Sequence, residues 1–189
     1  MIYIKFGGTV DDKRVIRLIE EEFIDIAEIS GWKYELVSEN FRTLTNRANK
    51  ELFLAGAEKE DAEGFYPLNS SDVFLEGISL ALAPNMDPLR FVFDKAQKLS
   101  TISFSSAEAN SPNSKFAVKK YEFLYYPYIK LVTNNHENHT KAVKILEYVK
   151  KKYIRDLEVI DTSFYWENRD EEALKVRFWK QRKDREMTV

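Results

Sequence analysis

His136 and His139 are the only histidines of this chain, and they lie three residues apart in the segment NNHENHT. An imidazole titrates near neutral pH, so it can act as a general acid or base, or bind a metal ion. A metal site needs three or more ligands, and the chain has no cysteine to supply one. These residues therefore predict no metal centre and no cofactor. The sequence favours a structural place for both histidines in a polar helix-entry loop, with catalysis by them as the alternative.

Carboxylates are the other residues that could do chemistry. Asp156, Glu158 and Asp161 flank a short predicted strand, where they could bind the metal ion of a nuclease. That class of nuclease also needs Glu-x-Lys on a neighbouring strand, and the chain contains no such triplet. The G-x-S-x-G motif of serine hydrolases is also absent. The sequence therefore favours a non-catalytic protein over an enzyme.

Gly7 and Gly8 separate a predicted strand from a predicted helix, in the segment KFGGTV. A helix that starts after such a turn offers free backbone N–H groups to an anion. KFGGTV also resembles the KFGGTS opening of aspartokinases and related amino-acid kinases. This likeness covers residues 5–10 alone, and the later Gly-rich phosphate loops of those kinases do not recur. A tight strand-to-helix turn is the favoured interpretation, and a phosphate site is the alternative.

The charge distribution is uneven although the net charge is only −2. Residues 1–114 carry 12 Lys/Arg and 19 Asp/Glu, whereas residues 115–189 carry 17 and 12. Basic residues concentrate at 150–155 and at 175–185, where Trp179, Lys180, Arg182 and Lys183 are predicted binding residues. The sequence pI of about 5.9 is far below the value above 9 that is typical of a nucleic-acid-binding domain. If these residues bind a partner, another protein is favoured over nucleic acid. The other interpretation is that they form a solvated face or an internal complement to the acidic half of the chain.

Aromatic side chains form the second predicted binding surface. Tyr125, Tyr126 and Tyr128 lie on a β segment that Pro127 interrupts, and Trp166 follows the last predicted strand. Alternate residues of a strand face opposite sides, so core packing does not account for all of them. Tyr and Trp are common in protein interfaces because they bury a large area at low entropic cost. The exposed strand edge beside them could also pair with a second copy to form a homodimer.

Hydrophobic periodicity predicts the elements that position these residues. The predicted strands are 2–6, 32–37, 74–82, 89–93, 99–104, 116–132 and 157–160. The predicted helices are 12–29, 42–57, one that Asn135 or Asn138 caps and that continues to Tyr153, and 169–185. Residues 57–72 and 105–114 are predicted surface loops, the second one mobile. This order of elements predicts an α+β fold: a mainly antiparallel sheet with helices packed on one face, in two layers.

With 189 residues, the chain is long enough to bury roughly 70% of the surface that it exposes when unfolded. We expect one α+β domain over residues 1–189, with a possible subdivision near 105–114. The sequence contains no signal peptide and no membrane-spanning run, and the lack of cysteine suits the cytoplasm. We therefore expect a cytoplasmic, non-catalytic protein-interaction protein, such as an adaptor, an inhibitor or an assembly partner. The alternative is a nucleic-acid-binding protein or a hydrolase that uses His136 and His139 with the basic C-terminal helix.

Overall fold

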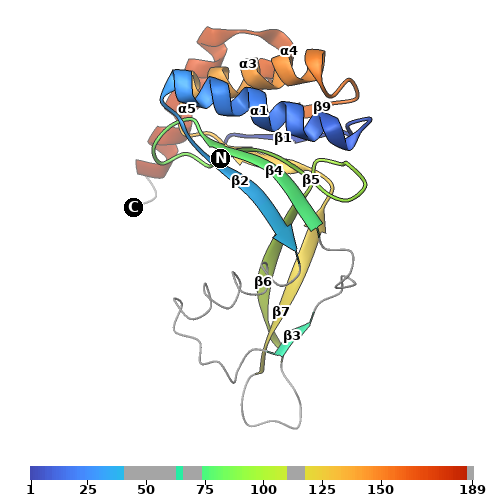
Figure 1. Cartoon of the computed structure of the whole chain (residues 1–189). Helices are drawn as coiled ribbons and strands as arrows, with labels where there is room; N and C mark the ends of the chain where they lie inside the picture. Colours follow the sequence, from blue (N-terminus) through green and yellow to red (C-terminus); the bar gives the residue numbers. More distant parts are fainter. Residues whose placement is uncertain (41–62, 66–73, 110–117, 187–189) are drawn as a thin grey trace.

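The chain alternates between strands and helices, and the helices lie together on one face of the strands (Figure 1). This computed structural model describes residues 1–40, 63–65, 74–109 and 118–186. Its helices are α1 (Lys13–Ser30), α3 (His136–Lys152), α4 (Tyr165–Asn168) and α5 (Glu171–Glu186). Its strands are β1 (Tyr3–Gly7), β2 (Lys33–Asn40), β3 (Glu63–Phe65), β4 (Phe74–Ala81), β5 (Leu89–Phe93), β6 (Thr101–Ala109), β7 (Val118–Tyr126), β8 (Ile129–Val132) and β9 (Glu158–Asp161). The predicted α+β fold with helices on one face is therefore confirmed.

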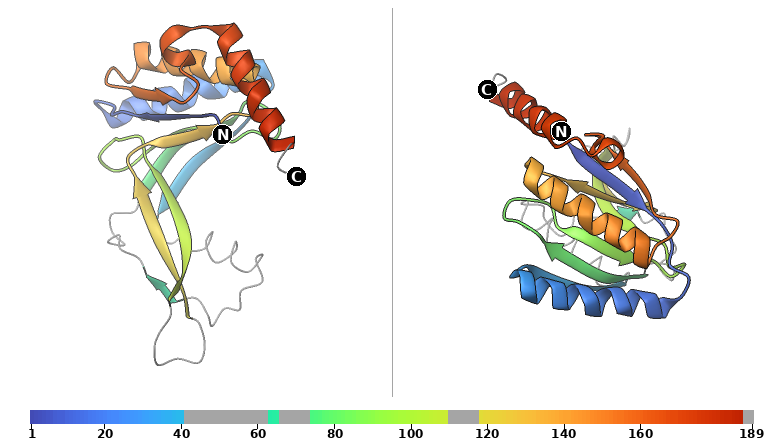
Figure 2. Two further views of the ribbon diagram at one scale, coloured as in Figure 1. Left: turned by 180° about the vertical axis from the view of Figure 1, so that it is seen from behind. Right: turned by 90° about the horizontal axis from the view of Figure 1, so that it is seen from above.

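Helix α1 shows how the sequence produces this layering. Asp12 caps its start, because the Asp12 carboxylate accepts a hydrogen bond from the Arg14 N–H at 2.7 Å. Gly31 ends the helix in the left-handed conformation, with a φ of 68°. The buried residues recur at steps of three and four along the helix and so lie on one face: Ile16, Ile19, Phe23 and Ala27. Seen from above, α1 and α3 lie side by side over the strands, and α5 lies toward the opposite edge (Figure 2).

The strands form three small sheets, with orders β8-β1-β9, β2-β4-β5 and β3-β7-β6. The pairings are antiparallel, apart from the parallel pairing of β3 with β7. The register of β1 with β9 places Ile4 opposite Asp161, which brings the end of β9 beside the centre of its sheet. This placement matters because the residues that follow Asp161 build part of the candidate site.

The core joins the helices to the first two sheets. The Phe23 ring of α1 stacks on the Phe91 ring of β5 with centroids 5.0 Å apart, and Phe6 of β1 packs against the same ring at 6.0 Å. Strand β4 approaches β5 so closely at Gly77 that a Cβ atom there would lie 2.0 Å from the Phe91 carbonyl oxygen. With a φ of 147° as well, this position requires glycine.

The β6–β7 ribbon projects from the two-layer body (Figure 1). The predicted long β segment is divided at Pro127: β7 pairs with β6, and β8 pairs with β1. Proline cannot donate a ladder hydrogen bond, which explains why the pairing changes partner there. Residues 105–109 were predicted to be loop and instead belong to β6, because each pairs across the ribbon with a residue of β7.

Two further predictions concern the chain between β2 and β4. Residues 63–65 of the predicted loop 57–72 form strand β3 instead, because all three pair with β7. The predicted helix 42–57 lies outside the described residues. Among the helices of the described part of the chain, none combines the length and the apolar character needed to cross a membrane.

Candidate functional site: a basic pocket on a buried polar network

A hollow of about 510 Å³ lies between the C-terminal end of α3 and the short helix α4. Its lining consists of four basic residues, one acidic residue and one aromatic residue: Lys150, Lys151, Arg155, Arg169, Glu147 and Trp166. We call it the basic pocket. Positive charges in the lining exceed negative ones by three, so the chemistry that the pocket favours is the binding of an anion.

Helix α3 supplies two lysines of the pocket because its last turn carries Lys150, Lys151 and Lys152. Basic side chains in a last turn offset the negative end of the helix dipole. The three lysines have different surroundings, since Lys150 donates to the Leu157 carbonyl oxygen and Lys152 forms an ion pair with Glu22 of α1 at 2.6 Å. Lys151 lines the basic pocket and takes part in no ion pair within the described residues.

The ion pair of Lys152 joins α3 to α1. Burial alone would raise the pKa of Glu22, but hydrogen bonds from Lys152, Tyr148 and Tyr153 lower it below its ordinary value. The same carboxylate raises the pKa of Lys152. This lysine is therefore engaged in joining the helices rather than lining the pocket.

Arg155 reaches the pocket because its neighbours are buried. Ile154 and Leu157 are both fully buried, and they anchor the segment between α3 and β9 in the core. Arg155 between them is exposed, and no ion pair or hydrogen bond involves its guanidinium within the described part of the chain. Together with Lys151, it supplies the positive charge that the fold leaves without a partner.

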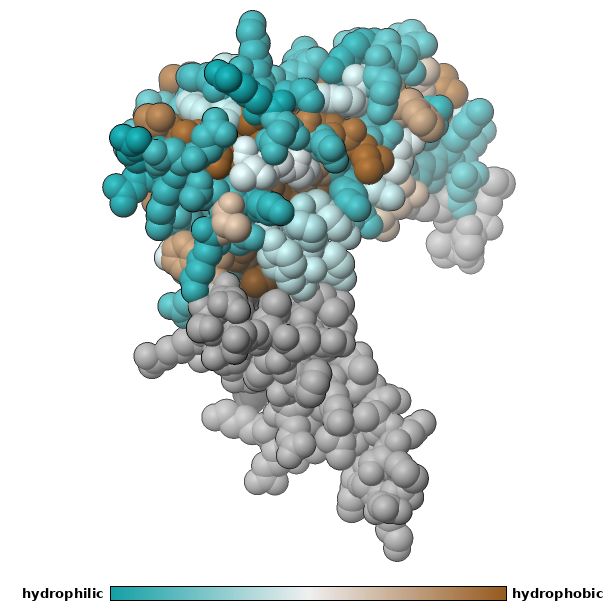
Figure 3. Space-filling model, turned by 90° about the vertical axis from the view of Figure 1, so that its right-hand side faces the viewer, coloured by the Kyte–Doolittle hydropathy of each residue, from teal (hydrophilic) through white to brown (hydrophobic). Residues whose placement is uncertain are grey.

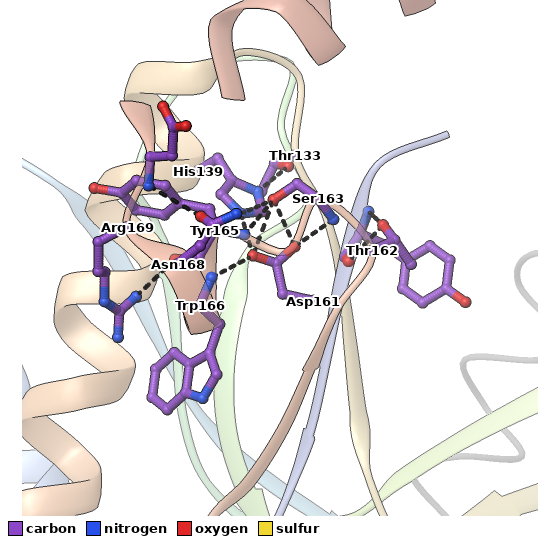
Figure 4. Close-up of polar contacts among 11 residues, drawn as sticks. Thr133, His139, Asp161, Thr162, Ser163, Tyr165, Trp166, Asn168 and Arg169 are labelled. Carbon is purple, nitrogen blue, oxygen red and sulfur yellow. Dashed lines mark hydrogen bonds and ion pairs between the residues drawn. The ribbon is translucent and has the colours of Figure 1, made fainter. Parts of the chain in front are cut away.

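Trp166 of the pocket comes from α4, an element that the sequence did not predict, and Arg169 is the residue that caps the C-terminal end of α4. The Arg169 guanidinium lies 4.9 Å from the centre of the Trp166 ring, forms an ion pair with Glu147 of α3, and donates to the Tyr165 carbonyl oxygen at 3.2 Å. Figure 4 shows the Trp166 ring and Arg169 on the same side of α4. These contacts fix both side chains against α3.

A buried polar network holds α4 in place (Figure 4). The Asp161 carboxylate accepts hydrogen bonds from the backbone N–H groups of Ser163 at 2.8 Å and Trp166 at 2.9 Å. It also accepts from the Ser163 hydroxyl at 2.7 Å and contacts His139 Nε2 at 3.0 Å. Phe164, which precedes α4, adopts a φ of 60°. Asp161 therefore fixes the turn that brings Trp166 to the pocket.

The electrostatics of Asp161 follow from these bonds. Burial alone would raise its pKa, but the hydrogen bonds and the proximity of His139, together with the bonds from Ser163, lower the pKa below its ordinary value. On the other side of the imidazole, His139 Nδ1 lies 2.9 Å from the Thr133 hydroxyl. Both nitrogens of His139 thus have partners in the network.

The residues Ser163, His139 and Asp161 do not form a catalytic triad. In a triad, serine and aspartate contact opposite nitrogens of the imidazole. Here Ser163 Oγ and the Asp161 carboxylate both lie 3.0 Å from Nε2. The side chains of His139 and Asp161 are also fully buried, so a substrate cannot reach them. The arrangement orients α4 and leaves no accessible nucleophile.

The structure corrects the predicted location of the histidines. Both belong to α3 rather than to an entry loop: Asn135 caps the helix, His136 is its first residue, and His139 is in its first turn. His139 is buried because its ring packs against Tyr165 and against Phe178 of α5. His136 is half-buried and is not a member of the network. Within the residues that the structure describes, no group of three His, Asp or Glu side chains is placed to hold a metal ion.

The binding residues predicted on α5 lie on a separate exposed surface. Trp179 is 56% exposed, and Lys183 Nζ lies 4.2 Å from the centre of its ring. Lys180 and Arg182 are exposed as well, and none of these three cations forms an ion pair within the described residues. Helix α5 is anchored by Leu174 in its first turn and by Phe178 near its middle, and its C-terminal end extends away from the body (Figure 2).

The three predicted tyrosines lie elsewhere. The Tyr125 hydroxyl donates to Asp94 at 2.6 Å and contacts Ser100 at 3.0 Å, so it joins β7 to the turn before β6. Burial, together with that bond to Asp94, raises the pKa of Tyr125. The Tyr126 and Tyr128 rings are 5.4 Å apart, and Lys5 Nζ lies 3.7 Å from the Tyr128 ring centre. Of the predicted binding residues, therefore, Trp166 alone lines the basic pocket, where it meets residues of the basic cluster at 150–155.

The turn at Gly7 and Gly8 is occupied by bonds within the chain. The Thr9 N–H donates to the Asp156 carboxylate at 3.0 Å, and the Val10 N–H donates to the Gln97 carbonyl oxygen at 3.1 Å. A Cβ atom at Gly8 would lie 2.5 Å from the Ile154 side chain. These contacts are those of a tight strand-to-helix turn.

On the side of the molecule drawn in Figure 3, hydrophilic side chains cover most of the helical layer, and hydrophobic areas are small and separate. That surface does not offer a large apolar docking face, which leaves charge as the main feature for recognition there. Comparison with protein-family models, curated proteins and solved structures gave no match for this chain.

Proposed function

We propose that this protein is a non-catalytic interaction protein that binds an acidic partner protein through the positive surface of its C-terminal third. The observation that carries the proposal is the clustering, at two places in the C-terminal third, of exposed cations that form no ion pair within the described residues. They are Lys151 and Arg155 at the basic pocket and Lys180, Arg182 and Lys183 on α5. Charges of this kind speed the encounter with an oppositely charged protein and select against wrong partners.

The exposed apolar side chains of α5 support the same proposal. The helix exposes Val176 at 48% and Trp179 at 56% on a segment rich in cations. Tryptophan is enriched among the residues that dominate interface energetics, and a surrounding of basic residues selects an acidic partner. Because the full burial of His139 removes it from contact with a substrate, a hydrolase that uses His136 and His139 receives no support. In this proposal the protein acts in the cytoplasm, in keeping with its lack of cysteine.

Charge reversal on α5 tests the proposal. Immobilised protein captures its partner from native cytosol before and after nuclease treatment. The triple variant Lys180→Glu, Arg182→Glu, Lys183→Glu is expected to weaken capture by roughly tenfold, equivalent to about 1.4 kcal/mol. The effect is expected to shrink in 1 M salt, where the Debye length falls to about 3 Å. Thermal stability is expected to change little, because each exposed charge contributes only about 0–1 kcal/mol.

A matched control separates a local effect from net charge. Arg17, Lys33 and Lys98 are exposed and lie outside the C-terminal third, and their reversal to Glu changes the net charge equally. This control variant is expected to capture the partner as the unaltered protein does. Equal losses of capture in both variants would contradict the proposal. Loss of capture after nuclease treatment would also contradict it, because the partner would then be nucleic acid. Recovery of a second copy of this chain would identify the partner as the protein itself and the complex as a homodimer.

A further inference from the structure

Lys151 and Arg155 of the basic pocket belong to the positive surface proposed above, and the pocket also has a volume and a charge that suit a small anion. We propose that it binds a phosphate monoester of a small molecule, with the phosphate between Lys151 and Arg155 and the remainder of the ligand against Trp166. This inference goes beyond the proposed function because it concerns another ligand class. It shares Lys151 and Arg155 with the positive surface and uses no residue of α5.

The existing hydrogen bonds and ion pairs of the four basic pocket residues indicate where the phosphate binds. Lys150 and Arg169 already donate to Leu157 and to Glu147. Lys151 and Arg155 line the same pocket and form no ion pair within the described residues. A guanidinium presents a rigid fork of donors that matches phosphate oxygens, and a lysine adds a point charge. This pair supplies both of the usual basic ligands of a phosphate.

The balance of charge favours a dianion. The lining carries an excess of three positive charges, whereas the C-terminal end of α3 contributes only about half a negative charge. A single carboxylate would leave most of this excess uncompensated. A phosphate monoester carries about −1.5 to −2 charges at pH 7 and offers three acceptor oxygens. The phosphate therefore matches both the charge and the donors.

The size of the pocket leaves room for more than a phosphate. A volume of about 510 Å³ lies within the range of roughly 300–1,000 Å³ typical of small-molecule sites. Trp166 is the aromatic part of the lining and is half-buried. A flat ring attached to the phosphate can pack on such a surface. A nucleoside monophosphate is the simplest probe with both parts.

The pocket is also held in place before any ligand binds. Asp161 accepts the Trp166 N–H at 2.9 Å, and Glu147 with the Tyr165 carbonyl oxygen fixes Arg169. A site whose walls are fixed in advance loses less conformational entropy on binding. The buried network therefore has a consequence for recognition as well as for folding.

Titration calorimetry and ¹⁵N NMR of the tryptophan indole signals, with adenosine monophosphate and with inorganic phosphate, test the proposal. We expect both probes to bind, the nucleotide more tightly, with a shift of the Trp166 signal. Lys151→Gln with Arg155→Gln is expected to weaken both by at least tenfold, and Trp166→Leu is expected to weaken the nucleotide more than phosphate. The matched control, Lys180→Gln with Lys183→Gln on α5, is expected to change affinity less than twofold.

Three outcomes would overturn the inference. The first is the absence of binding by either probe at 10 mM, and the second is equal weakening by the pocket pair and the α5 pair. The third is nucleotide binding no tighter than that of phosphate, which would contradict the role of Trp166. Because Trp166 donates its backbone N–H to Asp161, the leucine variant keeps the bond that positions α4. The proposed protein partner on α5 can fail or hold independently of these results.

Discussion

Replacing Asp161 with alanine is expected to lower the free energy of unfolding by about 3–5 kcal/mol. The substitution removes the acceptor of four groups that the core encloses: the Ser163 hydroxyl, the N–H groups of Ser163 and Trp166, and His139 Nε2. A buried donor left without a partner costs about 1–3 kcal/mol, and rearrangement of the turn recovers part of that sum. Denaturant unfolding followed by circular dichroism measures the loss.

A neighbouring carboxylate provides the control. Asp156 is exposed and accepts one hydrogen bond, from the Thr9 N–H at 3.0 Å. Asp156→Ala is expected to cost about 0.5–1.5 kcal/mol, the usual value of one such bond. Equal losses in the free energy of unfolding of the two variants would contradict the role of Asp161 as the acceptor of the buried network.

The pH dependence gives a second check with a definite sign. The folded protein holds the pKa of Asp161 below its ordinary value, so the unfolded chain binds a proton there more readily. The stabilisation is therefore complete above the unfolded pKa of about 3.9 and is lost as the pH falls through the folded pKa. The difference between the unaltered protein and Asp161→Ala is expected to narrow below pH 4.

Phe23→Ala is the other change with a large expected effect, a loss of about 3–5 kcal/mol. The Phe23 side chain is only 1% exposed, and its ring stacks on the Phe91 ring with the centroids 5.0 Å apart. It lies in the layer that joins α1 to the strands. Truncation removes the ring that fills the space between α1 and the strands, and it leaves a cavity that neither element can easily close. The midpoint of denaturant unfolding measures the effect.

The same helix contains a suitable control. Ile29 is 88% exposed, so Ile29→Ala is expected to change the free energy of unfolding by no more than about 0.5 kcal/mol. A loss below about 1 kcal/mol for Phe23→Ala would mean that α1 packs through another face.

Local patterns predicted the elements whose buried faces and caps lie within one stretch of sequence. Helix α1, Lys13–Ser30, lies within one residue of the predicted 12–29 at each end, and α3 is capped by Asn135, one of the two predicted caps. Strands β4 and β5 also lie where alternation predicted them. In these segments, periodicity and turn residues agree with the packing that the fold imposes.

The errors concern pairings between distant parts of the chain. Residues 105–109 have the composition of a loop, yet they form strand because β7 lies beside them. Strand β3 likewise exists through its parallel pairing with β7. Propensity is a weak guide where cross-strand partners decide the conformation.

The candidate site was predicted only in part for the same reason. The basic cluster at 150–155 and Trp166 were recognised separately, and the fold brings them together with Arg169, which the sequence did not single out. The network that holds them joins Thr133, His139, Asp161 and Ser163, which lie up to 30 positions apart in the chain. The one local signal was Asp161 two residues before Ser163, the spacing of a side chain that accepts from the backbone in a turn.

The central claim is that the positive C-terminal surface, and not the histidine pair, is the functional surface. Titration of ¹⁵N-labelled protein with a short polyglutamate peptide tests it most directly, because Trp32, Trp166 and Trp179 give separate indole signals. Trp179 is on α5, Trp166 lines the basic pocket, and Trp32 packs against the core as an internal reference. The account predicts that the signals of Trp179 and Trp166 shift with saturation, that Trp32 does not, and that salt reduces the shifts. Unchanged signals of Trp179 and Trp166, or equal shifts of all three, would contradict it.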